Sequence, residues 1–353
     1  MHSRDMIEHL KLGFDGSAYI ESQSQAISKR VDEFEGKLYL EIGGKFLLDS
    51  HAGRVLPWFF PDSKKQIFSK FKEKADILFC LNADDLYHNR QLCDENISYG
   101  AYCIEAIKDI KTQLQILPKV VINRVSPQNQ VLVDGYAVSL NNHGFDVYFR
   151  YDIDGYPSDT ATILSQEWYG KDDYIQTIYD LVLVTGPASS SGKMSSCLGQ
   201  IYLESLKWID SWYAKYETFP IWDLALDHPV NLAYEAATAD IWDYNQIDSF
   251  HKKAYSIESV NYNRDLEAFL IVSELAKNIL PKENPTRHYK SPTDMWISTA
   301  GLHIFDENII SQACEAEIHR RIDWYKQIIA RGEGDEVWIA RCENLLKRIG
   351  KKK

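Results

Sequence analysis

Residues 181–209, LVLVTGPASSSGKMSSCLGQIYLESLKWI, are the stretch that best predicts the fold. The first five residues are apolar or β-branched, which is typical of a buried strand, and an amphipathic helical pattern begins at Lys193. Small, flexible residues join the two. A strand, a loop and a helix in this order are typical of parallel sheets in α/β proteins, so we expect that fold class.

The same alternation of strands and helices continues on both sides of this stretch. Strand patterns cover residues 37–42, 76–81, 120–125, 146–149, 181–185 and about 213–217. Helical patterns cover residues 18–34, 64–74, 99–114 and 128–142, and later residues 229–242, 265–280, 308–330 and 336–349. We predict a Rossmann-like, mostly parallel sheet covered by helices within residues 1–225, followed by a mainly helical region at 226–353 that completes the site.

The composition limits the classes of partner. The chain has 353 residues, with 51 acidic and 39 basic side chains and a formal net charge of −12. This balance repels nucleic acid and anionic membranes, so we expect neither as a partner. The six cysteines form no CxxC pair, and no apolar run approaches the length of a membrane span. We expect a cytoplasmic protein with reduced thiols, and homo-oligomer formation stays open.

The loop between the quoted strand and helix is a candidate phosphate site. A tight loop and a helix N-terminus direct backbone N–H groups at an anion, and a lysine adds positive charge. The candidate ligands are Gly186, Ser190, Ser191, Gly192, Lys193 and Ser195. The match to the P-loop pattern G-x-x-x-x-G-K-[ST] is imperfect, because five residues separate the glycines and Met194 follows the lysine. The alternative is an ordinary loop in which Ser191 caps the helix and Lys193 is exposed.

A second basic turn follows the first predicted strand, at Gly43-Gly44-Lys45. Paired glycines let a ligand approach the backbone, and Lys45, His51 and Arg54 together could hold an anion or transfer a proton. A tight turn with surface charges explains the same residues equally well. Two later loops add Arg264 and Lys290 as candidate phosphate ligands, although a plain surface charge is the commoner role of such residues.

The predicted helix at residues 229–242 has an unusual polar face. Its residues His228, Asn231, Glu235 and Thr238 recur at helical spacing, while the other faces are apolar. We expect this stripe to face a cleft, where His228 or Glu235 would transfer a proton. Asp240 is a further catalytic candidate, and Ser195 and Asp240 are the candidate ligands of Mg²⁺. The alternative is an internal stripe whose hydrogen bonds are structural.

These candidates favour a nucleotide-dependent enzyme, a transferase or ligase that uses ATP and Mg²⁺ on a small anionic metabolite. One alternative is a metal-dependent hydrolase or phosphodiesterase with His51, Asp84 and Asp240 close together. Another is a nucleotide-binding protein without catalysis. A peptidase is not indicated, because neither a G-x-S-x-G nor an H-E-x-x-H motif occurs.

Longer segments carry a resemblance to a family. KLYLEIGGKFLLDSHAGRVLP, VTGPASSSGKMSSCLGQIY and YAKYETFPIWDLALDHPVNLAYEAATAD resemble the uncharacterised bacterial domain-of-unknown-function family eighteen-forty-six. The resemblance implies an α/β fold of several subdomains and a nucleotide-binding role without a defined reaction, and members carry the label of ATP-dependent peptidase. Trp296 stands where the family pattern has glycine. Family members are longer, so the resemblance also implies a C-terminally shortened chain.

A shorter motif has a resemblance of its own. Lys193-Met194-Ser195-Ser196 is similar to the loop of class I aminoacyl-tRNA synthetases that steadies the triphosphate of ATP. Those enzymes also carry a histidine-rich signature at the first turn between strand and helix, and this chain lacks it there. The synthetase is therefore an alternative of a different class, and the missing signature argues against it.

Overall fold

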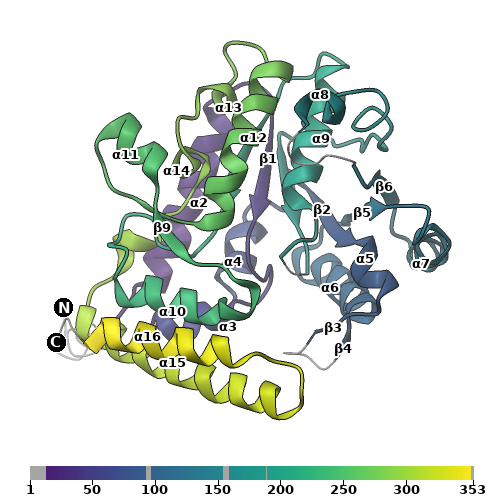
Figure 1. The fold of residues 1–353 in the computed structure, drawn as a ribbon. Coiled ribbons are helices and arrows are strands. Elements are labelled where there is room, and N and C mark those ends of the chain that lie inside the picture. The colour runs from purple at the N-terminus through teal and green to yellow at the C-terminus, as the bar shows by residue number, and fades with distance from the viewer. Residues whose placement is uncertain (1–12, 93–96, 154–158, 188, 351–353) are drawn as a thin grey trace.

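The computed structural model describes residues 13–92, 97–153, 159–187 and 189–350. At its centre is a six-stranded sheet in the order β6-β5-β2-β7-β1-β8, in which all neighbouring strands run parallel (Figure 1). The strands are β1 (Lys37–Ile42), β2 (Ala75–Asn82), β5 (Lys119–Val125), β6 (Val147–Tyr151), β7 (Leu181–Thr185) and β8 (Ser211–Tyr216). Each corresponds to a predicted strand, which confirms the α/β prediction.

Helices cover both faces of this sheet because side chains alternate along each strand. In β1, Leu38 and Leu40 belong to one apolar core, whereas Tyr39 belongs to the other. The helices on the first face are α2 (Gly16–Asp32), α4 (Ser63–Ser69), α6 (Tyr99–Leu114) and α7 (Gln130–Asn142). The helices on the second face include α8 (Thr160–Ile163), α9 (Lys193–Ser205), α12 (Asn263–Ile279) and α14 (Pro292–Met295). Both cores are continuous along the strands.

The later helices share the first core. Figure 1 shows α15 (Glu307–Ala330) and α16 (Glu336–Gly350) side by side, with α10 (Pro229–Ala237) and α3 (Ser50–Val55) beside them. Ile310 and Ile318 of α15 are buried in the same cluster as Leu40 of β1. The helical region therefore packs directly on the α/β part.

Shorter elements complete the described chain. They are α5 (Ala83–Tyr87), β3 (Gln91–Leu92), β4 (Ile97–Ser98), η1 (Ala239–Ile241), β9 (Asn245–Ile247), α11 (Ser249–Tyr255), β10 (Val260–Tyr262), α13 (Pro285–His288) and η2 (Ala300–His303). The predicted helix at 229–242 is divided: α10 begins at Pro229, with His228 as its N-cap, and ends at Ala237 before the 3-10 turn η1. Proline at the first helical position fits this start, because its missing N–H would have no acceptor there.

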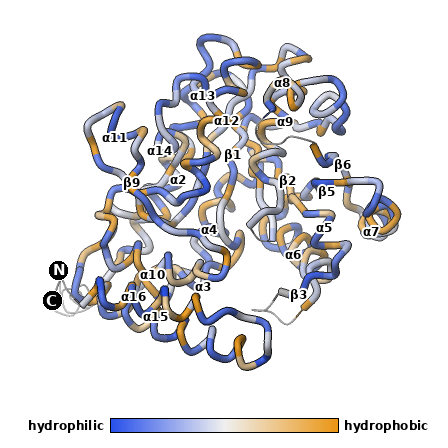
Figure 2. Tube along the Cα trace, viewed as in Figure 1, coloured by the Kyte–Doolittle hydropathy of each residue, from blue (hydrophilic) through white to orange (hydrophobic). Residues whose placement is uncertain are grey.

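Hydrophobic residues are exposed at one edge of the molecule. Figure 2 shows apolar positions on α7, where Val131, Leu132 and Val138 are exposed. Large hydrophobic side chains are also exposed elsewhere, for example Trp208, Ile178 and Leu302, whereas those of the strands and inner helix faces form the two buried clusters. Among the described helices, none has the length and apolar character needed to cross a membrane.

Candidate functional site

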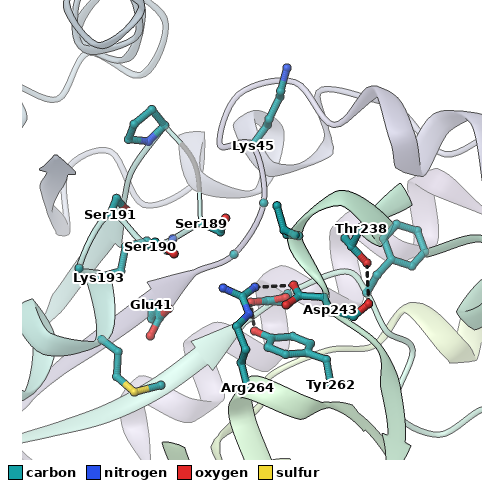
Figure 3. A pocket seen from close by; sticks show the side chains of 18 of the residues that line it. Glu41, Lys45, Ser189, Ser190, Ser191, Lys193, Thr238, Asp243, Tyr262 and Arg264 are labelled. Atoms are coloured by element: carbon teal, nitrogen blue, oxygen red, sulfur yellow. Dashed lines mark hydrogen bonds and ion pairs between the residues drawn. The ribbon is translucent and has the colours of Figure 1, made fainter. Parts of the chain in front are cut away.

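A large cavity lies at the carboxyl ends of the parallel strands, where ligands of open α/β sheets bind. Its volume is about 1100 Å³. The residues that follow β1, β6, β7 and β8 contribute to its wall, together with Asn123 and Arg124 near the end of β5 and residues of α3, α10, α12 and α15. Figure 3 shows the loop with Ser189, Ser190 and Lys193 on one side of the space and Arg264 and Asp243 on the other.

Two asparagines position the loop that follows β7. Asn82 Nδ2 donates to the carbonyl of Ser190 at 3.1 Å, and Asn123 Nδ2 donates to the carbonyl of Ser191 at 3.0 Å. Ser196 Oγ also donates to Asn123 Oδ1 at 2.9 Å. The carbonyls of the loop are therefore engaged by the ends of β2 and β5, which fixes the loop against the sheet.

The start of α9 is shaped by Gly192. Its φ of +83° lies in the left-handed region that favours glycine, and a Cβ at this position would meet Asn123 Cγ at 2.6 Å. As the N-cap, Gly192 offers no side-chain hydrogen bond to the first turn. Ser191 Oγ is buried and has no partner among the described residues. The cap by Ser191 that the ordinary-loop alternative requires is not formed, and the first amides of α9 have no intrahelical acceptor.

The predicted phosphate ligands mostly come together at this wall. Ser190, Ser191, Gly192, Lys193 and Ser195 all line the cavity. Gly186 is not among the described lining residues, but it makes the turn possible, because a Cβ there would overlap Ser191 Oγ and meet the carbonyl of Cys80 at 2.7 Å. The loop therefore presents one group of polar atoms to the cavity.

The Gly43-Gly44-Lys45 turn also reaches the cavity. A Cβ at Gly43 would overlap the carboxyl group of Glu217, and Gly44 has a φ of +65°. The buried Lys64 Nζ donates to the carbonyls of Gly43 at 2.7 Å and Lys45 at 3.1 Å. Lys64 thus holds the turn in place, while the side chain of Lys45 extends away from the loop after β7 in Figure 3.

His51 and Arg54 of α3 meet a buried glutamate on α15. His51 Nδ1 lies 3.2 Å from Glu317 Oε1, and Arg54 Nε donates to Glu317 Oε2 at 2.7 Å. Burial lowers the pKa of His51, so its imidazole is neutral at neutral pH, with Nδ1–H directed at the carboxylate. Both His51 and Arg54 line the cavity, as the sequence prediction requires.

A buried network of charges forms another part of the wall. Lys215 Nζ of β8 is 2.7 Å from Asp265 Oδ1 and 3.1 Å from Glu217 Oε1, and it also contacts Tyr262 Oη. Tyr262 Oη donates to Glu217 Oε1 at 2.6 Å. Glu41 lies close enough that its charge acts on Lys215. Burial alone would lower the pKa of Lys215, but the nearby carboxylates raise it, so the ammonium is retained.

Arg264 and Asp240 line the cavity from other elements. Arg264 Nη2 is 2.6 Å from Asp243 Oδ2, and its guanidinium stacks over the Tyr262 ring at 5.4 Å (Figure 3). Asp240 of η1 accepts a hydrogen bond from Tyr325 Oη at 3.3 Å. Asp84, by contrast, binds Arg124 and Asn129 and is not among the described lining residues. The hydrolase alternative, which needs Asp84 beside His51 and Asp240, gains no support from this placement.

Besides Gly186, three predicted residues lie outside the described lining of the cavity: His228, Glu235 and Lys290. His228 caps α10 and its Nε2 is 2.8 Å from Glu307 Oε2. Glu235 Oε2 accepts from the amide of Asn245 at 3.3 Å, and Lys290 Nζ lies 5.5 Å from the Tyr255 ring centre. Their contacts favour structural roles.

The rest of the polar stripe on α10 also binds backbone. The buried Asn231 accepts from the amide of Ile221 at 2.9 Å and donates to the carbonyl of the same residue at 3.2 Å. Thr238 lines the cavity, but its Oγ1 donates to the carbonyl of Tyr234 at 3.1 Å. The structural alternative for this stripe is therefore the one that the contacts favour.

The charge of the cavity is opposite to that of the whole chain. Among its described lining residues, eleven are Lys or Arg and eight are Asp or Glu. The chain as a whole carries a formal net charge of −12. A cavity with this local excess of cations attracts anions and focuses the field more strongly than an open surface does.

The sequence also matches a family model along almost all its length. The model is described as "Domain of unknown function DUF1846, N-terminal" and covers residues 12–350. The chain belongs to this family. The DUF1846 match confirms the resemblance at the level of the family, which has no assigned reaction.

Curated relatives agree with this family membership. A UPF0371 protein of Streptococcus uberis is 40% identical over 343 residues, which span 96% of this chain and 68% of the relative. A UPF0371 protein of Streptococcus pyogenes is 40% identical over 96% of this chain and 67% of its own length, and one of Clostridium botulinum is 39% identical over 96% and 66%. The chain thus spans about two-thirds of the length of these relatives.

Several residues at the cavity of this DUF1846 member were not predicted from the sequence. Glu41, Lys215 and Glu217 stand within or directly after strands whose other residues, apart from the first of each strand, are apolar or aromatic. A charge on a buried strand is costly unless it is paired, so its presence there is a usable signal. Glu317, Arg320 and Arg321 lie on a helix rich in charges, where no local pattern separates them from an exposed face.

Proposed function

We propose that this chain is a nucleotide-dependent enzyme, a transferase or ligase that uses ATP with Mg²⁺ on a small anionic metabolite. The observation that carries the proposal is the first turn of α9, which starts at the cavity wall behind Gly192 and has no side-chain cap. Amides at a helix start have no intrahelical acceptor, and the helix dipole attracts phosphate to them. Lys193 adds a positive charge at the same wall.

The polar groups around this turn suit a triphosphate. Ser191 Oγ is buried at the wall without a partner among the described residues, and Ser195 is the next lining serine after Lys193. The cavity, at about 1100 Å³, exceeds the roughly 300–1,000 Å³ typical of pockets for drug-sized ligands. It therefore has room for a nucleotide and a second small substrate.

Magnesium would require few protein ligands in such a site. Mg²⁺ usually keeps several waters and binds substrate phosphates together with one or two protein oxygens. Ser195 and Asp240 are the candidate protein ligands, and both line the cavity. The described residues include no group of three His, Cys, Asp or Glu side chains suited to a metal, so the nucleotide itself would supply most of the coordination.

The buried network around Lys215 is the best placed group for handling a proton. It joins carboxylates, an ammonium and the hydroxyl of Tyr262 by hydrogen bonds at the cavity wall. A connected set of this kind can accept a proton from a substrate and share the charge among its members. In our proposal, Glu217 and Tyr262 therefore transfer the proton, in place of the residues expected from the sequence, His228 and Glu235.

The first test is calorimetric titration of ATP and Mg²⁺ into wild type, Lys193→Ala and Lys290→Ala at one salt concentration. We expect micromolar binding to wild type and to Lys290→Ala, whose lysine lies outside the described cavity lining. Lys193→Ala should bind at least about tenfold more weakly, since it loses a charge beside the phosphates. Equal affinity of wild type and Lys193→Ala, or no binding by wild type, would refute the nucleotide site.

A further inference from the structure

Three arginines converge on one buried carboxylate at a different part of the cavity wall. Glu317 Oε2 accepts from Arg54 Nε at 2.7 Å and from Arg320 Nε at 2.6 Å. Glu317 Oε1 accepts from Arg320 Nη2 at 2.8 Å and from Arg321 Nε at 3.2 Å. We call Arg54, Arg320 and Arg321 the arginine cluster. It joins α3 to α15, and all three members line the cavity.

The cluster carries an excess of positive charge. Burial would raise the pKa of Glu317, but hydrogen bonds from Arg320, His51 and Arg54 outweigh this effect and hold the pKa well below its usual range. Glu317 is therefore ionised. His51 adds no charge at neutral pH, because burial lowers its pKa. Glu317 and the three arginines together thus carry three positive charges and one negative charge, and Asp240 lies near Arg321, since both act on Tyr325.

The geometry leaves donor groups for a ligand. Arg54 and Arg321 reach Glu317 through Nε alone, so this contact does not use their terminal Nη groups. Arg321 is additionally held in place by the Trp324 ring, whose centre lies 5.4 Å from its Cζ. The side chain of Arg54 is 35% exposed and that of Arg321 is 11% exposed, so both are oriented by the protein yet reachable. Guanidinium groups fixed in this way suit bidentate binding of an oxyanion.

Only Arg54 ties α3 to α15, whereas Arg320 and Arg321 reach Glu317 from within α15, three and four residues further along the helix. Bringing three like charges together costs free energy, which one carboxylate offsets only in part. The carboxylate of Glu317 makes this arrangement possible and also sets the direction of each guanidinium group. An anion in the cavity would offset the remaining charge.

We propose that the arginine cluster is a second anion subsite, separate from the start of α9, which holds the carboxylate or phosphate group of the small substrate. The inference rests on the proposed function in one respect: the bound anion is called a co-substrate because the chain is proposed to be an enzyme that also binds ATP. Arg54 and Arg321 bind the oxyanion directly through their terminal Nη groups, while Arg320, which holds Glu317 through Nε and Nη2, and Glu317 itself are positioning residues. The site therefore selects small anions and leaves the nucleotide to the loop after β7.

The experiment uses inorganic phosphate and succinate as probes, titrated calorimetrically into the full chain carrying Lys193→Ala. This background weakens the proposed nucleotide site, so the remaining binding reports on the cluster. We expect binding of at least one probe, with the stronger one identifying the substrate group. Adding Arg54→Gln or Arg321→Gln should weaken that binding at least tenfold.

A matched control is Arg124→Gln in the same background. It removes the same charge from the same cavity, but Arg124 pairs with Asp84 at 3.1 Å and with Asp152 at 3.3 Å rather than with Glu317. We expect a change of less than threefold. Circular dichroism checks folding, and the more exposed Arg54 keeps the test valid if Arg321→Gln does not fold.

Three outcomes would overturn the second subsite: no binding of either probe to Lys193→Ala, unchanged binding after Arg54→Gln, or equal losses with Arg54→Gln and Arg124→Gln. The ATP titration of wild type and Lys193→Ala is a separate readout. The nucleotide site can therefore fail while the cluster binds its probe, and the reverse result is equally visible.

Discussion

Glycine residues determine how closely the chain approaches itself around the cavity. Gly192 has a φ of +83°, and a Cβ there would lie 2.6 Å from Asn123 Cγ. Gly144 has a nearly equal φ of +79° but no atom within 4 Å of an added Cβ. The two positions therefore separate the cost of the backbone conformation from the cost of a steric clash.

We expect Gly192→Ala to weaken ATP binding by about tenfold or more, because the added Cβ displaces Asn123 and the loop that it holds. Gly144→Ala should leave ATP affinity unchanged, although the left-handed conformation costs it about 1 kcal/mol of stability. Calorimetry gives the affinities and urea unfolding gives the stabilities. Unaltered ATP affinity in a folded Gly192→Ala variant would show that the loop geometry is not needed for binding.

Individual site residues could be predicted only where local sequence carries the signal. Lys193 stands out because it follows a strand and a glycine, a context that can be read without tertiary structure. Glu317 has no such context, since its partner Arg54 lies 263 positions away in the sequence. Long-range contacts of this kind are set by the packing of α15 against α3, which a single sequence leaves open.

At the scale of elements, the strands were predictable because their burial is nearly complete. All eight residues of β2 are buried, and so are all five of β7, which gives short apolar runs between polar turns. The sheet order was not predictable, because β7 inserts between β2 and β1 through contacts with no local signature. This insertion places the loop after β7 in the middle of the carboxyl edge.

Two helices carry a glycine in their interior, with different surroundings. Gly135 of α7 is exposed and has no atom within 4 Å of an added Cβ. Gly199 of α9 allows the guanidinium of Arg150 to lie against the helix, where a Cβ would overlap Arg150 Nη1. Arg150 is buried there and pairs with Asp172 at 2.9 Å.

We expect Gly135→Ala to raise the free energy of unfolding by about 0.5–1 kcal/mol, since alanine restricts the unfolded chain and favours the helix. Gly199→Ala gains the same helix propensity but should lower stability, because Arg150 and Asp172 would be pushed out of their buried pairing. Urea unfolding of both variants beside wild type measures the difference. A stabilised Gly199→Ala variant would contradict the packing described for Arg150.

At the scale of the whole molecule, the net charge of the chain does not predict the charge of its cavity, because folding brings basic side chains together there. The formal net charge of −12 predicts repulsion of polyanions, yet the cavity gathers more cations than acids. The arginine cluster illustrates the separation, because α15 must pack against α3 before its charges become part of the wall. The number of charges was readable from the sequence, whereas their arrangement required the fold.

The free energy of unfolding should depend on pH in the acid range because of the ionisation of Glu317. Its pKa in the folded protein lies well below the ordinary value, so its contribution to stability is fully present above the unfolded pKa of about 4.3 and is lost as the pH falls toward the folded value. We expect Glu317→Gln to cost about 2 kcal/mol at pH 7, less than the loss of a fully buried pair, because Glu317 is buried but Arg54 and Arg320 are partly exposed. Below pH 4.3 the difference in free energy of unfolding between wild type and Glu317→Gln should shrink by up to about 1.4 kcal/mol per pH unit.

Urea unfolding of both proteins from pH 7 to pH 3 measures this gap in free energy directly. A gap that stays constant across this range would mean that the arginine cluster does not hold an ionised Glu317 in the folded state.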